Sequence, residues 1–427
     1  MIEAPLSRRG LLGRVALLGA GAALPWPALA ASPADWPRVR ALVDRYVGER
    51  RLAGAVATLG FGEGPLQAIV RGTEGFTDAD AVAADSLFRV YSMTKPVTGM
   101  AAMLLIEEGR LGLDQELADI FPEFANMQVA IDPANGLDAR PAKTPITIRH
   151  MLTHTAGFGY AGIARDAVSM ALLNQGVTPA VVSRLPIPGI TPPVPTLPAE
   201  AFLRRAAQTP LLAEPGTRWA YSMSLDLLGL VIAKVSGAAS FEAFLAERLF
   251  GPAGMTSSFF RVPPARTGRL TTNYAVLGSL PLALDPAETT IYLDEPAFAF
   301  GGAGLVTTPA DYDRFLMLLV NGGRIGGRQV IPASAVALGM SNLLPQGIDT
   351  RGTFIEGAGF GAGGRVGLGA DAGSFGWSGA AGTVGFVNAR IGLRAGLYVQ
   401  FMPPGSLPIQ QEFITAARDD VLERAHP

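Results

Sequence analysis

The stretch FRVYSMTKPVT, residues 88–98, carries the features on which the interpretation of this chain depends. Apolar residues recur from it at helical spacing, at Met93, Val97, Met100, Ala101, Leu104 and Leu105. We expect a helix with Ser92 as its N-cap or first residue, with Pro96 tolerated in its first turn and an end near Gly109. Ser92 and Lys95 are three residues apart, so they lie on one face of that turn.

The basic residue of this stretch is informative because lysine is rare here. Lys95, Lys143 and Lys234 are the only lysines among 34 basic residues, and the other 31 are arginines. An arginine keeps its proton in a protein, whereas a buried lysine amine can become neutral and basic. The pattern predicts Ser92 as a nucleophile activated by Lys95, against the alternative that Ser-x-x-Lys arises by chance.

The first thirty residues have the pattern of an export signal. Arg8 and Arg9 precede a short apolar run at 15–23, and Ala28-Leu29-Ala30 matches a small-x-small cleavage site. The run is too short to span a bilayer of ~30 Å. We predict a twin-arginine signal at residues 1–30, a periplasmic location, and no integral membrane segment in the mature chain; an uncleaved anchor is the alternative.

Composition narrows the class of partner. The formal net charge of −2 argues against nucleic acid and against an anionic membrane, which leaves a small molecule. Cysteine is absent, which excludes disulfides and thiol catalysis, and no His, Asp or Glu cluster has metal-ligand spacing. We therefore predict no metal and no cofactor. The pattern Gly359-x-Gly361-x-x-Gly364 lacks the flanking strand and helix of a dinucleotide site and is discounted.

Both ends of the chain have strand and helix patterns of one layered domain. The expected helices and strands are, in chain order, a helix at 36–50, strands at 54–60, 66–70, 374–388 and 392–402, and a helix at 409–424. They predict a mixed α/β (α+β) fold in which an antiparallel sheet is flanked by helices. This part would comprise residues of about 31–91 and 291–427, with a mostly helical part at about 92–290 inserted between them.

The middle of the chain alternates between helices and loops. Helices are expected at 147–157, at 225–236 after a cap at Ser222 or Ser224, at 241–250 after a cap at Ser240, and from Pro309 to about Asn321. Tyr221 is left on the turn before the second of them. Residues 184–198 are too rich in proline for a helix, and they predict either a flap over a pocket or surface polyproline packing.

Three short motifs follow one another along the chain: Ser92-Met93-Thr94-Lys95, Tyr221-Ser222 and Trp377-Ser378-Gly379. In this order the chain resembles the serine β-lactamase and penicillin-binding-protein superfamily, and most closely its family VIII carboxylesterases. Flanking stretches such as residues 152–157 and 250–255 are similar as well, so the resemblance covers about Trp36 to Met402.

The resemblance implies a role for each motif. Ser92 would be the nucleophile, Lys95 its activating base, and Tyr221 a phenol that shuttles protons to the leaving group. The oxyanion hole would be the backbone N–H groups of Ser92 and Ala380. The residues that would contact substrate are Trp377, Ser378, Gly379 and Met223.

Two departures from the β-lactamase pattern bear on the substrate. Met223 stands where those enzymes usually have asparagine, and Trp377 stands where they have lysine. An amide donor and a cation for a carboxylate are therefore missing, which favours an uncharged and more apolar acyl group. We predict a carboxylesterase that acts on short-chain or aryl esters through an acyl-serine intermediate.

Several other functions remain open at this stage. The superfamily permits hydrolysis of β-lactams or D-amino-acid peptides, acyl transfer to an alcohol, and a catalytically silent binding protein. A Ser-His-Asp hydrolase is disfavoured because no Gly-x-Ser-x-Gly elbow occurs and only His150, His154 and His426 are present. Acyl-chain length, stereopreference and oligomeric state do not follow from the sequence.

Overall fold

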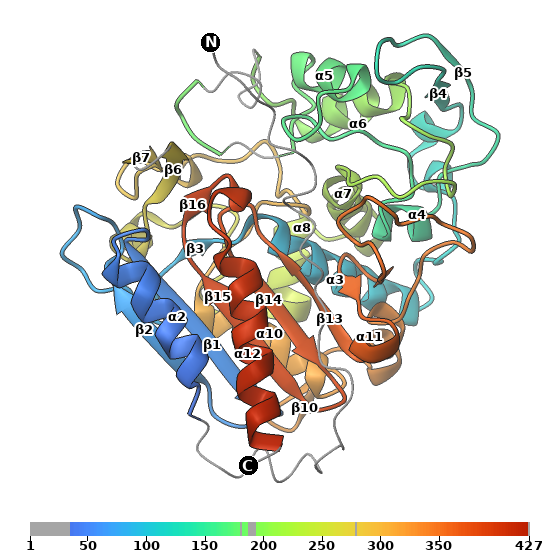
Figure 1. Ribbon diagram of the computed structural model, residues 1–427. Helices are drawn as coiled ribbons and strands as arrows, with labels where there is room; N and C mark the ends of the chain where they lie inside the picture. Colours follow the sequence, from blue (N-terminus) through green and yellow to red (C-terminus); the bar gives the residue numbers. More distant parts are fainter. Residues whose placement is uncertain (1–34, 180–181, 187–193, 278–279, 426–427) are drawn as a thin grey trace.

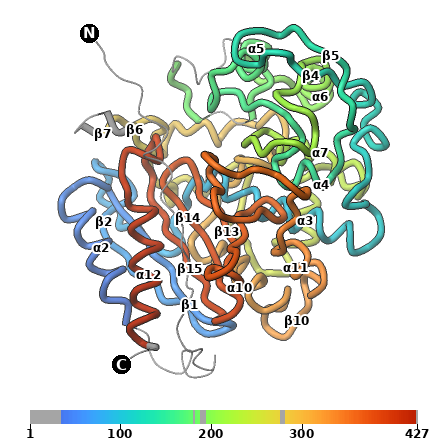
Figure 2. Tube along the Cα trace, turned by 45° about the vertical axis from the view of Figure 1, so that its right-hand side comes forward, coloured from blue at the N-terminus to red at the C-terminus, as the bar shows by residue number. Residues whose placement is uncertain are grey.

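The computed structural model describes residues 35–179, 182–186, 194–277 and 280–425. The predicted export signal at 1–30, His426, and residues 187–193 of the proline-rich stretch lie outside the described residues. Figures 1 and 2 show the described chain as a sheet with helices on both faces and a mostly helical part beside it.

A seven-stranded sheet forms the centre, in the order β11-β12-β13-β14-β15-β1-β2, and every neighbouring pair is antiparallel. Its strands are β1 (Gly54–Phe61), β2 (Gln67–Gly72), β11 (Gly359–Phe360), β12 (Arg365–Val366), β13 (Ser374–Ser378), β14 (Val384–Asn388) and β15 (Leu393–Tyr398). The first strand of the chain lies beside the last strand of this sheet, so both chain ends build it. The predicted antiparallel sheet and its N-terminal hairpin are confirmed.

Helices cover the two faces of the sheet. α2 (Pro37–Gly48) and α12 (Ile409–Ala425) lie side by side on one face, and α10 (Pro309–Val320) packs on the other (Figure 1). Successive strand residues point to opposite faces. Ala57 and Leu59 of β1 accordingly join the core under α2 and α12, whereas Val56 joins the core on the other side.

A buried ion pair ties the sheet to α10. The Arg394 guanidinium of β15 donates to Asp313 Oδ1 at 2.8 Å, and it also donates to the carbonyls of Gly62 and Gly64. Both charged side chains are almost completely buried. A Cβ on Gly60 would collide with this guanidinium. Because Gly60 has no side chain, the guanidinium packs against the backbone of β1.

The mostly helical part lies beyond one side of the sheet in both views. Its helices are α4 (Ile148–Leu152), α5 (Ala167–Asn174), α6 (Ala199–Gln208), α7 (Ser224–Ser236), α8 (Phe241–Leu245) and α9 (Gly251–Ala253). Between it and the sheet lies α3 (Thr94–Glu107), which contacts α7, β13 and α11 (Ala333–Gly339).

Short strands complete the fold. They are β3 (Phe88–Arg89) with β8 (Val306–Thr307), β4 (Gln128–Ala130) with β5 (Ala139–Pro141), β9 (Arg324–Ile325) with β10 (Arg328–Gln329), and β6 (Asn273–Leu277) with β7 (Leu280–Asp285) and β16 (Phe401–Met402). The pair β3 and β8 matters most here because it fixes the backbone just before Ser92.

Two predicted helix starts differ in detail. Ser92 makes no side-chain cap, because a single 3-10 turn, Tyr91–Met93, precedes α3. The predicted cap of α7 by Ser222 or Ser224 is wrong. Met223 is the N-cap residue, and no side chain caps the helix. The hydroxyls of Ser222 and Ser224 bond to each other instead, at 2.8 Å.

Two predicted helix ends also differ. α4 stops at Leu152 because His154, two residues later, has a left-handed φ of 57°. The helix capped by Ser240 does not stop before Pro252. It widens into a π turn at Ala246–Phe250 and ends one turn later at Gly254. The start of α10 at Pro309 and the end of α7 at Gly237 are confirmed.

Within the described residues, no single helix has the length and apolarity needed to cross a membrane. The segments Ser224–Ser236 and Phe241–Ala253 meet that test only when they are taken together as a pair, and they are bent by 72°.

The Arg394–Asp313 pair yields a stability prediction. Asp313→Ala leaves a buried guanidinium without its partner, so the free energy of unfolding should fall by about 3–5 kcal/mol. Urea unfolding followed by circular dichroism would measure this. Asp349→Ala, which removes an exposed partner of Arg351, should leave stability almost unchanged. Equal effects of the two changes would contradict the prediction.

Candidate active site

Ser92 sits on a constrained turn at the start of α3. Tyr91, the residue before it, has a φ of 41°, a left-handed conformation that is costly for a residue with a side chain. The backbone is held there by β3, and Val90 N–H donates to Leu305 O at 3.1 Å. Ser92 retains 8% of its residue surface exposed, whereas Lys95 is completely buried.

The structure brings Lys95 to Ser92, with Nζ 3.3 Å from Oγ. The amine has two further partners, the hydroxyl of Tyr160 at 3.2 Å and the carbonyl of Gly302 at 2.6 Å. An ammonium group has three hydrogens, so these three contacts account for all of them. Once neutral, the amine has a lone pair and can accept a proton from the Ser92 hydroxyl.

Sequence reasoning missed Tyr160. It lies on the loop after α4, is 3% exposed, and packs its ring against that of Tyr221 at 5.3 Å between centroids. Burial raises the pKa of Tyr160 well above its usual value, and the nearby Asp226 carboxyl acts in the same direction. Tyr160 is therefore a neutral phenol that holds the amine through a hydrogen bond.

Tyr221 is half-buried on the turn before α7, where the sequence placed it. Its ring centroid is 4.7 Å from Lys95 Nζ. Its phenol oxygen accepts a hydrogen bond from Trp377 Nε1 at 3.1 Å. No hydrogen bond joins this phenol to Ser92 or Lys95 among the described residues, so it faces the lysine with its ring.

The third motif ends β13 close to the serine turn. Trp377 is half-buried, Ser378 is exposed and Gly379 is buried. Gly379 must be glycine because a Cβ there would collide with the Val90 carbonyl. Neither the Ala380 amide nor the Ser92 amide has a backbone acceptor in the described chain, so both N–H groups are free to bind an oxyanion.

Met223 lies deeper than the other predicted substrate contacts. Its side chain is fully buried in the main core, and its backbone N–H donates to Gly159 O at 3.4 Å. A direct contact between Met223 and substrate stays a prediction. What the structure places at this position is an apolar side chain that fixes the turn carrying Tyr221.

Aromatic rings surround Tyr221 on several sides. Trp219, Phe354, Trp377 and His154 have ring centroids 6.1, 5.8, 5.7 and 4.7 Å from it. Phe354 is 45% exposed and so reaches solvent at the rim of this group. The surroundings of the Tyr221 ring are therefore largely aromatic.

Neither described histidine can act as the base for Ser92. The His150 side chain accepts from Thr147 N–H at 3.2 Å in the capping box of α4. His154 is completely buried, and its Nδ1 accepts from Ser222 N–H at 3.2 Å. Burial, with a smaller contribution from the Lys95 charge, lowers the pKa of His154 well below its usual value. Both rings thus have structural partners.

Asp226, in the first turn of α7, is a second group that the sequence did not reveal. Its carboxyl is completely buried and accepts from Gly302 N–H at 2.8 Å. Burial raises its pKa to about 7, although the nearby Lys95 charge opposes the shift. The site thus holds a buried amine and a buried carboxyl that are linked through one glycine.

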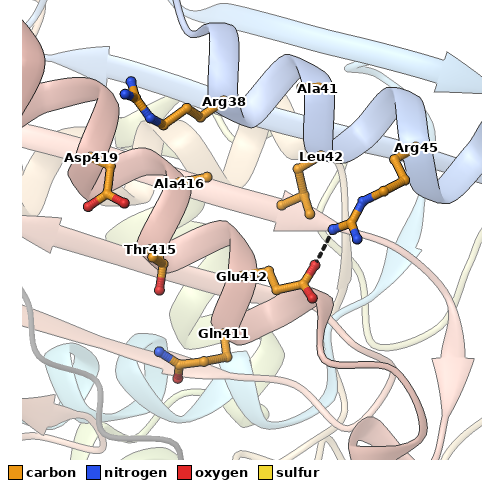
Figure 3. A pocket seen from close by; sticks show the side chains of 9 residues that line it. All are labelled: Arg38, Ala41, Leu42, Arg45, Gln411, Glu412, Thr415, Ala416 and Asp419. Atoms are coloured by element: carbon orange, nitrogen blue, oxygen red, sulfur yellow. Dashed lines mark hydrogen bonds and ion pairs between the residues drawn. The ribbon is translucent and has the colours of Figure 1, made fainter.

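Other kinds of site find little support among the described residues. No group of three His, Asp or Glu side chains there could hold a metal ion. An open groove of about 520 Å³ lies between α2 and α12, where Arg45 pairs with Glu412 (Figure 3). None of its lining residues belongs to the group around Ser92, so it is not the reaction site.

Several known proteins resemble this chain in sequence. The sequence profile of a family described as Beta-lactamase matches residues 39–418. Protein Rv1367c of Mycobacterium tuberculosis is 34% identical over 268 residues, 62% of each chain. Esterase EstB of Burkholderia gladioli is 33% identical over 224 residues, 50% of this chain and 49% of EstB. The chain thus spans about half to three-fifths of the length of the curated relatives it matches.

Solved structures share the fold. EstCE1, described as a hydrolase with promiscuous acyltransferase activity, superposes with a TM-score of 0.73 at 24% identity, covering 93% of this chain and all of EstCE1. A family VIII carboxylesterase superposes with a TM-score of 0.65 at 19% identity, covering 94% and 99%.

The buried His154 yields a prediction about protonation. Because burial disfavours the imidazolium, His154 should stay neutral well below pH ~6.5, the ordinary midpoint of histidine. The unfolded chain takes up that proton, so this group's contribution to stability is present above pH ~6.5 and is lost as the pH falls below it. Ring nitrogen shifts in ¹⁵N NMR, assigned with His154→Gln, would test this. A titration of His154 at the ordinary midpoint would contradict it.

Proposed function

This chain belongs to the beta-lactamase family, and from that premise we propose that it is a serine carboxylesterase acting on short-chain or aryl esters. The observation that carries the proposal is the completely buried Lys95 amine, which lies 3.3 Å from the hydroxyl of Ser92, a residue that is 8% exposed. A buried amine next to a reachable hydroxyl is the arrangement needed to make a serine nucleophilic without histidine.

The reaction has two steps. In the first, Lys95 takes the Ser92 proton while Oγ bonds to the ester carbonyl carbon, and the alcohol leaves with a proton. In the second, water attacks the acyl-Ser92 carbonyl and the acid is released, which restores the serine hydroxyl. The Ser92 and Ala380 amides would bind the oxyanion in both steps, and losing one such donor costs ~3 kcal/mol of barrier.

The two tyrosines have different parts in this proposal. Tyr160 remains a neutral phenol and orients the amine. Tyr221 is the proposed proton shuttle to the leaving alcohol, which requires its hydroxyl to turn from Trp377 toward the departing oxygen. Hydrogen bonds in free enzymes often tighten only when substrate binds, so the present contact with Trp377 is compatible with that role.

The surroundings of Ser92 favour an uncharged ester. Trp377 presents an indole where a substrate carboxylate would need a cation, and Met223 presents no amide donor. Trp219, Phe354 and Phe360 add apolar surface around Tyr221. EstB, which is named an esterase, supports this choice of substrate class.

Acyl transfer to an alcohol is a second candidate. The first step is the same, and an alcohol replaces water in the second. The apolar rings around Tyr221 would favour a hydrophobic alcohol over water, and the description of EstCE1 includes such an activity. Action on β-lactams or D-amino-acid peptides is disfavoured by the same apolar residues.

Location and domain organisation are part of the proposal. We propose export through a twin-arginine signal at residues 1–30 and a mature catalytic chain of 31–427. Within it, residues of about 31–91 and 291–427 would form the α/β part, and those of about 92–290 the helical part.

Variants of the motif test the nucleophile and its base. Ser92→Ala should abolish hydrolysis of p-nitrophenyl butyrate, and Lys95→Arg should reduce kcat/KM by at least ~10³-fold because arginine keeps its proton. Lys143→Arg, the same change at an exposed position, should leave the rate unchanged. Substantial turnover by Lys95→Arg with an unaltered fold would refute the role of Lys95.

Substrate preference is tested by comparing kcat/KM for two classes of substrate, aryl esters and a β-lactam. The mature protein should turn over aryl acetates and butyrates at least ~10²-fold faster, in kcat/KM, than a chromogenic cephalosporin, because Trp377 stands where a cation for the cephalosporin carboxylate would be needed. Comparable rates would favour the β-lactam alternative. Labelling of Ser92 by a fluorophosphonate separates a slow enzyme from a silent scaffold.

A further inference from the structure

Asp226 is a buried carboxyl for which the reaction proposed above has no use. It is completely buried, and while Oδ1 accepts from Gly302 N–H, Oδ2 has no partner among the described residues. Burying a carboxylate that lacks a full set of hydrogen bonds is strongly unfavourable. No salt bridge within the described chain includes Asp226, so its charge is not neutralised by direct contact.

Gly302 connects this carboxyl to the catalytic amine. Its N–H donates to Asp226, and its carbonyl accepts from Lys95 Nζ at 2.6 Å. A Cβ on Gly302 would collide with the Asp226 carboxyl oxygens, so the carboxyl packs against a bare backbone. The carboxyl and the amine therefore contact the same residue from two helices, α7 and α3.

The neighbouring segment holds Gly302 in place. Thr98 Oγ1 of α3 donates to Gly301 O at 2.6 Å, and a Cβ on Gly301 would collide with the Leu225 carbonyl of α7. Asp226 supplies the hydrogen bond from α7 to this segment. Without it, the carbonyl that faces Lys95 would lose its anchor on that side.

We propose that Asp226 is a positioning residue for Lys95: it holds the Gly302 carbonyl on the amine, and its charge decides whether the amine keeps its proton. The inference rests on the proposed hydrolase function. An ionised carboxylate stabilises the ammonium, which cannot take the Ser92 proton, whereas a neutral carboxylic acid favours the free amine.

The charges facing Asp226 come from few groups. α3 supplies Lys95, and the loop after α4 supplies Tyr160, which is neutral, and His154, which burial also keeps neutral.

The other charged groups on neighbouring helices have their own partners. On α4, Arg149 pairs with Asp114 at 2.6 Å, and His150 takes part in the capping box. On α8, Glu242 accepts from Phe260 N–H at 3.3 Å. Lys95 is thus the charge to which Asp226 responds, and burial brings the pKa of Asp226 to about 7.

The test measures how fast a fluorophosphonate labels Ser92 in the mature protein at each pH from about 5 to 9, by intact-protein mass spectrometry. Asp226→Asn keeps an acceptor for Gly302 N–H and removes the charge. Its acid limb, where the labelling rate falls, should lie ~1–3 pH units lower than in the wild type. Asp311→Asn makes the same change at a buried carboxyl that bonds to Ser257 and Ser258 instead, and its limb should not move.

The outcomes separate the two proposals. An unmoved limb in Asp226→Asn, even with a lower plateau rate, would show a merely structural residue and overturn this inference alone. A wild type that no fluorophosphonate labels at any pH would overturn the hydrolase proposal and this inference with it. If the asparagine variant does not fold, Asp226→Ser removes the same charge with a smaller side chain, and the same comparison of limbs applies.

Discussion

The contact between one buried amine and one serine hydroxyl is the interaction on which the rest of the site depends. Lys95 Nζ has three partners, and they come from three separate places: the same helical turn, the loop after α4, and the segment before β8. In the dry interior each of these bonds is stronger than in water, and a missing one would be costly. The amine thus joins the reactive serine, the helical part and the segment that leads into β8.

Close backbone approaches make this convergence possible. Gly99 on α3 leaves no room for a side chain against Ala362, and Gly363 leaves none against the Lys95 carbonyl. A Cβ on Gly301 would likewise collide with α7, and a Cβ on Gly379 would collide with the chain just before Ser92. Where a backbone must pass this near to another, only glycine fits. Neighbouring backbone segments therefore pack against the turn that carries Ser92 from several directions. This packing maintains the left-handed φ of Tyr91.

The site contains few charged groups, and burial strengthens the interaction between them. The buried Lys95 amine and the buried Asp226 carboxyl lie near Tyr160 and His154, which burial keeps neutral. The Lys95 amine is therefore placed mainly by its three hydrogen bonds, to Ser92, Tyr160 and Gly302. The buried Arg394–Asp313 pair under the sheet is different, because its charges are matched directly and serve the packing of α10.

The sequence by itself determined what is local. Ser92 and Lys95 share a helical turn, so their proximity follows from a spacing of three residues. Strand and helix patterns likewise predicted the antiparallel sheet, the hairpin and α10. The helix end at Leu152 was missed because His154 has a left-handed φ that a histidine rarely adopts. The end at Gly254 was missed because the helix continues past Pro252 through a π turn. Only the tertiary structure decided that Tyr160 and Gly302 would reach Lys95 from 65 and 207 residues away, and that Asp226 would lie behind Gly302. A buried tyrosine, glycine or aspartate has no sequence pattern of its own, since its role comes from its neighbours in space.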